Sequence, residues 1–217
     1  SGVLLDLLND ILDLSKLQAG KMELHKSPVN IINTFEKIEA LFSQKAKAKG
    51  LKFEYEVDTR ITNQFEIDET RLIQVLANLT SNSIKFTDNG HVKISATLLE
   101  EHTTTKTIQF RVEDTGIGIA QTDIKKLFND FHQLDNSTTK TYGGTGLGLS
   151  ISQELVELMG GNIRVASKLN QGSQFYFSFK VTASTKQIKD PRADSFKISD
   201  HHFTEKQPYI LVVDDNS

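Results

Sequence analysis

The chain has 217 residues, of which 37% are hydrophobic and 24% are charged, and its net charge is -3 at pH 7. This length can bury a sizeable core, either as one domain with appendages or as two small domains. The composition excludes wholesale disorder, the small net charge excludes the basic surface of a nucleic-acid-binding protein, and the lack of cysteine excludes disulfides, thiolate metal ligands and a cysteine nucleophile.

The opening segment, residues 1–24, is predicted to be an amphipathic helix because apolar side chains recur at helical spacing. These side chains are Leu4, Leu5, Leu7, Leu8, Ile11, Leu12 and Leu14. The apolar face is too wide for a lone surface helix, so we expect it to be covered on more than one side, as in a helical bundle. Without a partner helix, the stripe from Leu4 to Leu12 should drive self-association or pack on the rest of the chain.

A second amphipathic helix follows and is expected to end at Gly50. Residues 51–58 alternate apolar and polar side chains, which predicts a half-buried strand, and Phe65–Ile67 suggests a short strand. Asp68 comes next and can cap the start of the helix RLIQVLANLTSNSIKF, residues 71–86.

The second half of the chain is rich in predicted strands. Residues 91–100 and 106–114 read as two strands joined by a polar turn, and residues 121–128 as a short helix. A polar stretch without a clear period then leads to the glycine-rich segment 143–149 and to a helix that ends at a Gly-Gly pair. The last two strands of this region are predicted at 162–167 and 173–181.

The order of these elements predicts an α+β fold. Helices and strands are mixed, and several strands are antiparallel neighbours, so we expect a two-layer sandwich of a mixed, mostly antiparallel sheet and helices, preceded by a long N-terminal helix. Residues 183–208 are polar and contain two prolines, which is typical of a linker, and residues 209–217 begin a new buried strand.

The helix at 71–86 carries a line of polar side chains beside its buried stripe. Asn78, Asn82 and Lys85 recur at helical spacing, although asparagine is mildly unfavourable inside a helix. Amide oxygens are hard ligands suited to Mg²⁺, and a lysine one turn away suits phosphate. The same residues could form an ordinary solvated face, and this helix alone does not decide between the two interpretations.

Asp114 ends a predicted strand and is followed by Gly116 and Gly118. A carboxylate beside glycine backbone offers a hydrogen-bond acceptor that a flat ligand can approach closely. Taken alone, an Asp-Thr-Gly sequence after a strand is also the pattern of a simple turn.

The segment 143–149, GGTGLGL, holds four glycines just before a predicted helix. Glycines expose N-H groups that can surround phosphate oxygens at the positive end of that helix. Two common nucleotide motifs do not fit. A dinucleotide motif would need glycine at position 149 or 121, where leucine and glutamine stand, and the one Gly-Lys pair of the chain is followed by methionine, not by the serine or threonine of a Walker loop.

Four motifs stand in the order and at the ordinary separations of the N, G1, F and G2 boxes of sensor histidine kinases, which the chain therefore resembles. They are Asn78-x-x-x-Asn82-x-x-Lys85, Asp114-x-Gly116-x-Gly118, Phe128-x-x-Phe131 and Gly144-x-Gly146-x-Gly148. Four ordered matches are far more specific than any one of them.

The resemblance covers almost the whole chain. Residues 1–24 are similar to the second helix of the family's dimerisation and phosphotransfer hairpin, residues 29–182 to its ATP-binding domain, and residues 209–217 to the start of a receiver domain, with 183–208 as a linker. The resemblance therefore implies a histidine kinase/gyrase-type ATP-binding fold and a hybrid parent kinase.

The resemblance implies ATP and Mg²⁺ as cofactors and gives the polar helix residues a role. Asn82 would be the Mg²⁺ ligand, with Asn78 and Lys85 near the phosphates. Phosphoryl transfer needs the γ-phosphoryl group to be positioned and its charge to be neutralised, more than it needs covalent help from the protein.

For the remaining motifs the resemblance implies a base site and a lid. Asp114 would accept the hydrogen of the adenine amino group, and Gly116 and Gly118 would let the base pack closely. The lid would span residues 129–145 and fold over the triphosphate. Its anchoring and hinge residues would be Phe128, Phe131, Gly144, Gly146, Leu147 and Gly148.

The family's phosphate acceptor is a histidine followed by an acidic residue, on the helix before the one that opens this chain. None of the six histidines here is followed by Asp or Glu. The resemblance thus implies a kinase core with no catalytic acceptor of its own, which binds Mg-ATP but cannot label itself. Its implied partners are the phosphotransfer hairpin of the same or a paired kinase and the receiver domain of a homodimeric parent.

Two other functions stay open. The same fold serves gyrase-type and chaperone ATP-driven clamps, although these usually carry a catalytic glutamate in the first helical box, where this chain has Asn78 and no glutamate from 72 to 82. The chain could also be a degenerate dimerisation module that binds no nucleotide. No apolar run reaches the roughly 20 residues that span a bilayer, so we expect a cytoplasmic domain without membrane or nucleic-acid contact, whose parent could be anchored in the inner membrane.

Overall fold

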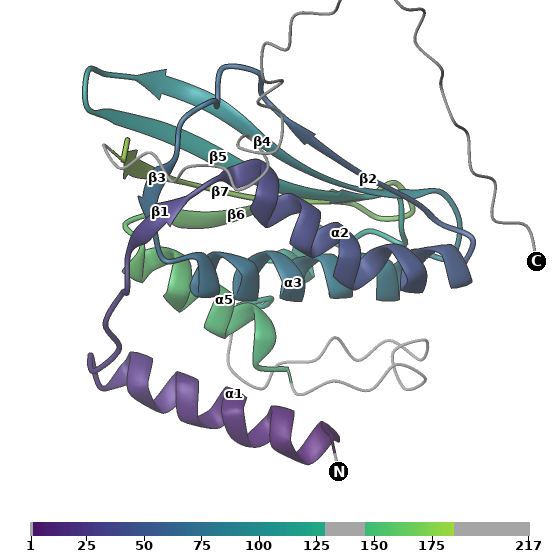
Figure 1. The fold of residues 1–217 in the computed structure, drawn as a ribbon. Coiled ribbons are helices and arrows are strands. Elements are labelled where there is room, and N and C mark those ends of the chain that lie inside the picture. The colour runs from purple at the N-terminus through teal and green to yellow at the C-terminus, as the bar shows by residue number, and fades with distance from the viewer. Residues whose placement is uncertain (1, 129–145, 185–217) are drawn as a thin grey trace, which may run out of the picture. The chain divides into compact units, whose positions relative to one another are not determined.

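The computed structural model of the chain describes residues 2–128 and 146–184, with side chains for residue 8 and from residue 11 onward in those ranges. A five-stranded sheet forms one layer, and α2 (Ile31–Ala48), α3 (Glu69–Phe86) and α5 (Gly148–Leu158) form the layer that covers one of its faces (Figure 1). This arrangement confirms the predicted α+β sandwich.

The strand order of the sheet is β2 (Lys52–Val57), β4 (His91–Glu101), β5 (Thr105–Asp114), β7 (Gly172–Thr182) and β6 (Asn162–Lys168). β2 is parallel to β4, and the other neighbouring pairs are antiparallel, so the sheet is mixed and mostly antiparallel, as predicted. Alternate side chains of β5 and β7 are buried against the helices, as expected for a sheet covered on one face. The last residue of β5, Asp114, therefore stands at the end of the central strand.

Aromatic side chains fill the space between the two layers. The ring of Phe110 on β5 stacks on the rings of Phe177 and Phe179 on β7, with centroid distances of 5.4 and 5.5 Å. Phe35 of α2 meets Tyr55 of β2 edge to face at 6.1 Å. Such pairs add roughly 0.5–1.5 kcal/mol each beyond the burial of apolar area. The two Phe110 pairs strengthen the sheet itself, and the Phe35–Tyr55 pair holds α2 on the sheet.

A small second sheet was not predicted. β1 (Ser27–Val29) pairs antiparallel with β3 (Phe65–Ile67). Three residues with a central Pro28 are too few to show a two-residue period, and proline is tolerated in a strand only at an edge. This strand therefore depends on β3 and cannot be found from its own sequence.

One predicted helix is shorter than expected. α4 (Gln121–Ile124) was predicted to reach residue 128, but the following turn is closed by i to i+3 hydrogen bonds, such as the one from the Lys126 N-H to the Asp123 carbonyl at 2.9 Å. Within the predicted helical segment 1–24, α1 (Gly2–Gln18) ends before Gly20, a residue typical of helix ends, whose φ is 63°.

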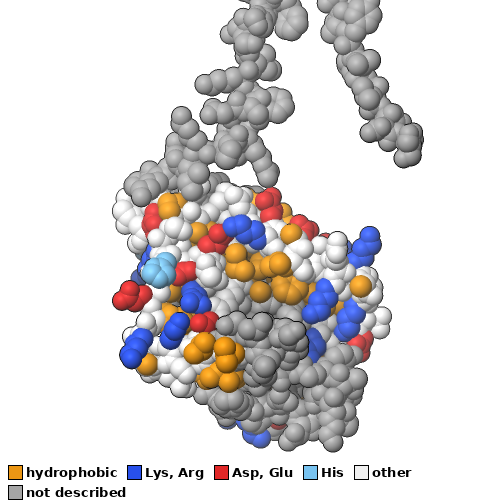
Figure 2. Space-filling view, turned by 60° about the horizontal axis from the view of Figure 1, so that its bottom comes forward, with side chains coloured by type: hydrophobic (Ala, Val, Ile, Leu, Met, Phe, Trp, Pro, Cys, Tyr) orange, Lys and Arg blue, Asp and Glu red, His pale blue; other side chains and the backbone are white. Residues whose placement is uncertain are grey.

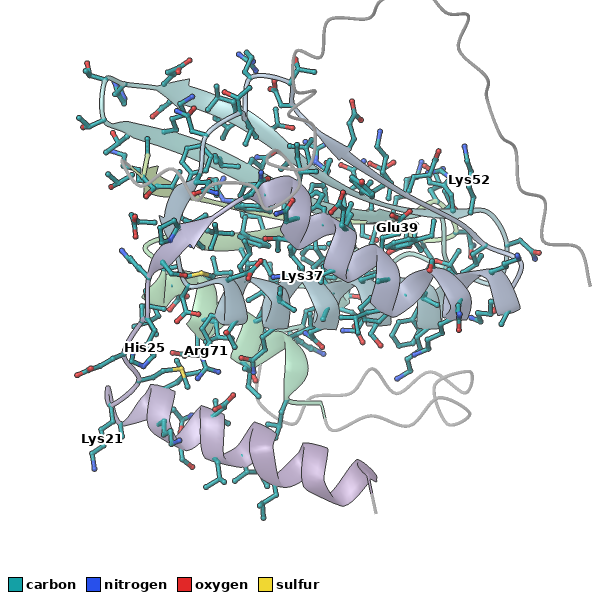
Figure 3. The ribbon with its side chains drawn as sticks, viewed as in Figure 1. Lys21, His25, Lys37, Glu39, Lys52 and Arg71 are labelled. Carbon is teal, nitrogen blue, oxygen red and sulfur yellow. The ribbon has the colours of Figure 1, made fainter. Side chains whose placement is uncertain are left out.

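One buried leucine and one polar cluster hold α1 against the helical layer. Leu14 is buried. Asp13 Oδ2 accepts hydrogen bonds from Arg71 Nη1 at 3.2 Å and from Gln74 Nε2 at 3.0 Å, and Figure 3 shows Arg71 between α1 and the other helices. α1 also contacts α5, so it lies on the side of the helices that faces away from the sheet (Figure 1).

The described side chains on the apolar face of α1 are covered on one side only. Leu8, Ile11 and Leu12 are 55%, 48% and 49% exposed, so these residues do not pack on the rest of the described chain. Figure 2 turns this side forward and shows hydrophobic groups exposed between charged side chains. Self-association through this stripe stays a prediction.

No helix within the described ranges is both long enough and apolar enough to cross a membrane.

Asp68 links the start of α3 to the chain before β1, because its Oδ1 accepts from the Arg71 backbone N-H at 3.1 Å and its Oδ2 from the His25 backbone N-H at 2.8 Å.

We expect Asp68→Ala to lower the free energy of unfolding by about 2 kcal/mol, since it removes a helix N-cap and a second hydrogen bond. Chemical denaturation measures the loss. The control Asp88→Ala, at an exposed aspartate, should stay within about 0.5 kcal/mol, and equal losses in the two variants would contradict this account.

Candidate functional site

The polar line of α3 lies along the edge of the buried stripe. Asn78 and Asn82 are both half-buried. Asn78 Nδ2 donates to Ser152 Oγ at 2.8 Å, which ties α3 to α5. The side-chain amide of Asn82 has no hydrogen-bond partner among the residues that the structure describes. The bond to Ser152 fixes the Asn78 amide with its Oδ1 beside Gly148, whereas no such bond within the described residues fixes the Asn82 amide, whose oxygen can turn to a ligand.

Lys85 brings positive charge to the same helix face. It is half-buried, and its ammonium lies 4.9 Å from the centroid of the Phe86 ring. Burial lowers the pKa of Lys85 because it disfavours the charged form, and the nearby charge of Lys45 lowers it further. An ammonium that has lost part of its hydration gains more from an approaching anion than an exposed one does, which suits a phosphate contact.

Asp114 is a buried carboxylate held by three donors. Its Oδ1 accepts from the backbone N-H of Gly116 at 2.9 Å and of Ser173 at 3.2 Å, and its Oδ2 accepts from the Ser83 hydroxyl at 3.2 Å. Burial raises the pKa of Asp114 above its ordinary value, while the three hydrogen bonds act in the opposite direction. A carboxylate has about four acceptor positions, so one position on Oδ2 stays available to a ligand donor.

The loop after Asp114 touches backbone on both sides. A Cβ at Gly116 would lie 2.3 Å from the Phe86 carbonyl oxygen, and a Cβ at Gly118 would lie 2.0 Å from the Lys168 carbonyl oxygen. Gly118 also has a φ of 65°, which favours glycine. Any side chain at these positions would push the loop away from α3 or from β6, so the two glycines fix its path.

The segment before α5 presses against α3. Gly146 has a φ of 74°, and Leu147 is fully buried. A Cβ at Gly148 would lie 2.4 Å from Asn78 Oδ1. Among the described residues, no side chain caps the N-terminus of α5, so its first backbone N-H groups can meet an anion.

The predicted lid is described only at its two ends. Phe128 is half-buried and packs against the hydrophobic core, as a core residue would. Phe131 and Gly144 lie outside the described residues, as does the lid segment 129–145.

Contacts along α3 join the three described motifs. Ser83, the residue next to Asn82, is hydrogen-bonded to Asp114, and Asn78 touches Gly148 at the start of α5. Within the described part of the chain, the C-terminal half of α3 thus carries an amide without a hydrogen-bond partner, and beside it lie the Asp114 acceptor and the N-terminus of α5, which no side chain caps. A ligand with a flat polar base and a chain of phosphates fits this set of groups.

Sequence reasoning missed several residues that shape the site. Ser83 and Ser173 donate to Asp114. Ser83 gave one signal, because it and Thr80 are the hydroxyl-bearing residues in the buried stripe of α3, and Ser173 gave none. Lys49 gave no signal. Its Nζ donates to the carbonyl oxygens of Ile84 at 3.0 Å, Lys85 at 2.9 Å and Thr87 at 2.9 Å, so it caps the C-terminus of α3 from the end of α2.

The fold and these groups define an α+β nucleotide-binding domain. Residues 67–183, more than half of the chain, match the family described as Histidine kinase-, DNA gyrase B-, and HSP90-like ATPase. The chain belongs to this family.

The curated relatives narrow the comparison to kinases. The hybrid signal transduction histidine kinase B of Dictyostelium discoideum is 42% identical over 175 residues, and the signal transduction histidine-protein kinase BarA of Escherichia coli strain K12 is 40% identical over 181 residues. The alignments cover 81% and 82% of this chain but 9% and 19% of these relatives, so the chain spans a small part of their length.

Solved structures agree with this family. Full-length ShkA in complex with AMPPNP has a TM-score of 0.74 and 33% identity, over 83% of this chain and 36% of that one. The Acinetobacter baumannii histidine kinase AdeS has a TM-score of 0.63 and 26% identity, over 84% of this chain and 80% of that one. The resemblance to the ATP-binding domain of sensor histidine kinases is thus confirmed.

Asp114→Asn tests the buried acceptor. The amide keeps the shape and can still accept from Gly116 and Ser173, but its NH₂ group replaces Oδ2 and meets a ligand amino group donor to donor. Mg-ATP affinity, measured by calorimetric titration, should fall about 10- to 100-fold, the equivalent of a hydrogen bond to a charged group.

The pH dependence of the same variant has a definite sign. The pKa of Asp114 is raised, so Asp114 takes up its proton at a higher pH than an ordinary aspartate does. On acidification, Mg-ATP binding to the wild type should therefore weaken at that higher pH, and the Asp114→Asn variant should show no such step. A raised pKa also means that the buried charge lowers stability above that pKa and that this cost is relieved as pH falls. The variant should therefore be at least as stable as the wild type at neutral pH, and marked destabilisation there would contradict the account.

Gly118 and Gly20 form a matched pair for the loop. Their φ angles are 65° and 63°, but a Cβ at Gly20 would meet nothing within 4 Å. Alanine at either position costs about 1–2 kcal/mol for the left-handed backbone, and only Gly118→Ala must also displace the loop from Lys168. Gly118→Ala should lower both the free energy of unfolding and Mg-ATP affinity more than Gly20→Ala, and equal effects would argue against the close contact.

Proposed function

We propose that this chain is the ATP-binding catalytic core of a hybrid sensor histidine kinase, which binds Mg-ATP and delivers its γ-phosphoryl group to a histidine on another helix. The observation that carries this proposal is the bond from Ser83 to Asp114. It joins the base acceptor to the helix that carries Asn82, so base and phosphate groups can be bound on one face of α3. The hybrid kinase relatives and the AMPPNP complex of ShkA support the same function.

The residues fit a nucleotide with its metal. Gly116 lets the loop after Asp114 lie directly against the end of α3, because a Cβ there would meet the Phe86 carbonyl oxygen, and this keeps Asp114 beside the helix that carries Asn82. Asn82 would offer its amide oxygen to Mg²⁺, and Lys85 would pair with a phosphate. When bound, Mg²⁺ would neutralise phosphate charge and orient the triphosphate. The N-terminus of α5 would add backbone N-H groups on the phosphate side.

The hinge and lid roles belong to the same proposal. Gly144, Gly146, Leu147 and Gly148 would let the segment before α5 move over the triphosphate, and Phe128 and Phe131 would anchor its other end. Gly148 also lies against Asn78, and this contact packs the start of α5 on α3.

The phosphate acceptor would come from outside the chain. His25, His91 and His102, the histidines of the described residues, are followed by Lys, Val and Thr. Transfer needs a nucleophile in line with the γ-phosphoryl group, and an adjacent carboxylate is the family's pattern. The proposed partners are therefore an intact phosphotransfer hairpin, a receiver domain that would begin at 209–217 after the linker 183–208, and a second copy of a cytoplasmic, homodimeric parent.

An ATP-driven clamp is the competing function in the same family. Such a clamp needs a glutamate that faces the phosphates from the first helical box. Glu69 is the one glutamate of α3, and its carboxylate pairs with Lys37 Nζ at 2.7 Å and accepts from the Thr34 hydroxyl at 2.9 Å. Because Glu69 is engaged by α2, the kinase function is favoured.

Phosphate transfer tests the proposal directly. The chain, mixed with Mg²⁺, radiolabelled ATP and an intact phosphotransfer hairpin of a histidine kinase, should put label on the hairpin and none on itself. Label on the 217-residue chain would refute the claim that the acceptor lies elsewhere. A chain that binds Mg-ATP but never labels any hairpin, and hydrolyses ATP instead, would favour the clamp.

Asn82→Ala tests the metal contact. We expect Mg-ATP affinity to fall at least about tenfold, because a contact to a charged group contributes about 1.5–3 kcal/mol. The control Asn33→Ala, at an exposed asparagine of α2, should change nothing. In excess EDTA the wild type and Asn82→Ala should bind ATP equally weakly, and a difference that persists without metal would show that Asn82 acts in some other way.

A further inference from the structure

Two hydroxyl groups interrupt the buried stripe of α3, those of Thr80 and Ser83. The Thr80 hydroxyl oxygen is buried without a hydrogen-bond partner among the described residues. The Ser83 side chain is 2% exposed, and its hydroxyl donates to Asp114 Oδ2 at 3.2 Å. A buried hydroxyl is costly unless it is hydrogen-bonded, and the bond to the Asp114 carboxylate offsets this cost for Ser83.

The three donors of Asp114 divide unequally between its two oxygens. Oδ1 receives two backbone N-H groups, from Gly116 and Ser173, and both of its acceptor positions are used. Oδ2 receives only the Ser83 hydroxyl, so the free position lies on the oxygen that Ser83 holds. A ligand donor that reaches Asp114 must therefore bind beside Ser83.

The surroundings of Asp114 leave few groups that can keep it ionised. Burial and the like charge of Glu113 on the same strand favour the neutral form, and the three donors favour the carboxylate. Ser83 on α3 and Ser173 on β7 do not titrate themselves. Two of the three donors are main-chain N-H groups, which only proline would remove, so Ser83 is the one donor that comes from a side chain.

We propose that Ser83 is a positioning residue for base recognition: its hydroxyl orients Asp114 so that the site selects a purine that carries an exocyclic amino group. This inference rests on the proposed function, since it assigns the selectivity of that nucleotide site. It assigns no contact between Ser83 and the phosphates or the metal. A purely structural Ser83 would affect all nucleotides alike, whereas a positioning Ser83 would affect those with the amino group.

The test compares two nucleotides on three proteins. ATP and purine riboside triphosphate, which lacks the amino group, are titrated with Mg²⁺ into the wild type, Ser83→Ala and the control Thr34→Val. Thr34 is also a buried hydroxyl, with contacts to Asn30 and Glu69 and none to Asp114. We expect Ser83→Ala to weaken ATP about tenfold and the purine nucleotide less than twofold, and Thr34→Val to weaken neither.

A pH series gives a second readout. Without Ser83 the carboxylate loses a hydrogen bond that favours its ionised form, so ATP binding to Ser83→Ala should begin to fail at a higher pH than binding to the wild type. Ser83→Cys keeps the shape of the side chain with a somewhat larger atom and a weaker donor, and should lie between the two. This variant also provides the answer if Ser83→Ala does not fold.

The role of Ser83 and the proposed nucleotide binding would fail on different results. If the wild type binds neither nucleotide, the proposed function fails. If the wild type prefers ATP but Ser83→Ala and Ser83→Cys weaken both nucleotides equally, or neither, with an unchanged pH profile, the inference on Ser83 is overturned and the proposed function stands.

Discussion

A buried carboxylate at the end of the central strand is the constraint on which the site depends. An ionised group away from water costs several kcal/mol unless donors replace its hydration. Asp114 obtains these donors from three separate parts of the chain: α3, the loop directly after Asp114, and the start of β7. Because each donor must stay within hydrogen-bond distance, the need to solvate one charge fixes three elements relative to one another.

Close backbone contacts make that arrangement possible. A Cβ at Gly172 would lie 2.0 Å from the Asp114 carbonyl oxygen, so only glycine lets β7 begin near enough for the Ser173 N-H to reach the carboxylate. Gly116 likewise lets the loop after Asp114 approach the C-terminal end of α3, and Gly148 lets the start of α5 approach α3 at Asn78. Lys49 then caps the end of α3 through three carbonyl oxygens. The helix that carries the polar line is thus held at both its sides and its end.

Sequence patterns predicted the parts of this molecule that repeat along the chain. The alternation in β5 and β7, the stripe of α3 and the Asp68 cap all come from residues close together, where the period or the spacing is visible. The partners of the site are different. Ser83 and Asp114 are 31 residues apart, Asp114 and Ser173 are 59 apart, and Asn78 and Ser152 are 74 apart. Only the fold brings such pairs together, so the motifs could indicate where a ligand binds but not which side chains hold the acceptor.

The contacts of α1 that involve described side chains are weak beside those that hold Asp114. Burial of Leu14 is worth about 1.5–3 kcal/mol, and the partly exposed pair of Asp13 and Arg71 adds about 1 kcal/mol at most. Both are small against the roughly 5–15 kcal/mol that stabilises a typical domain. The donors of Asp114 lie on α3, on the loop after Asp114 and on β7, and none of them lies on α1. Under the function proposed above, the domain carries a phosphoryl donor to a histidine on another helix, and the exposed Leu8, Ile11 and Leu12 are available to meet such a helix.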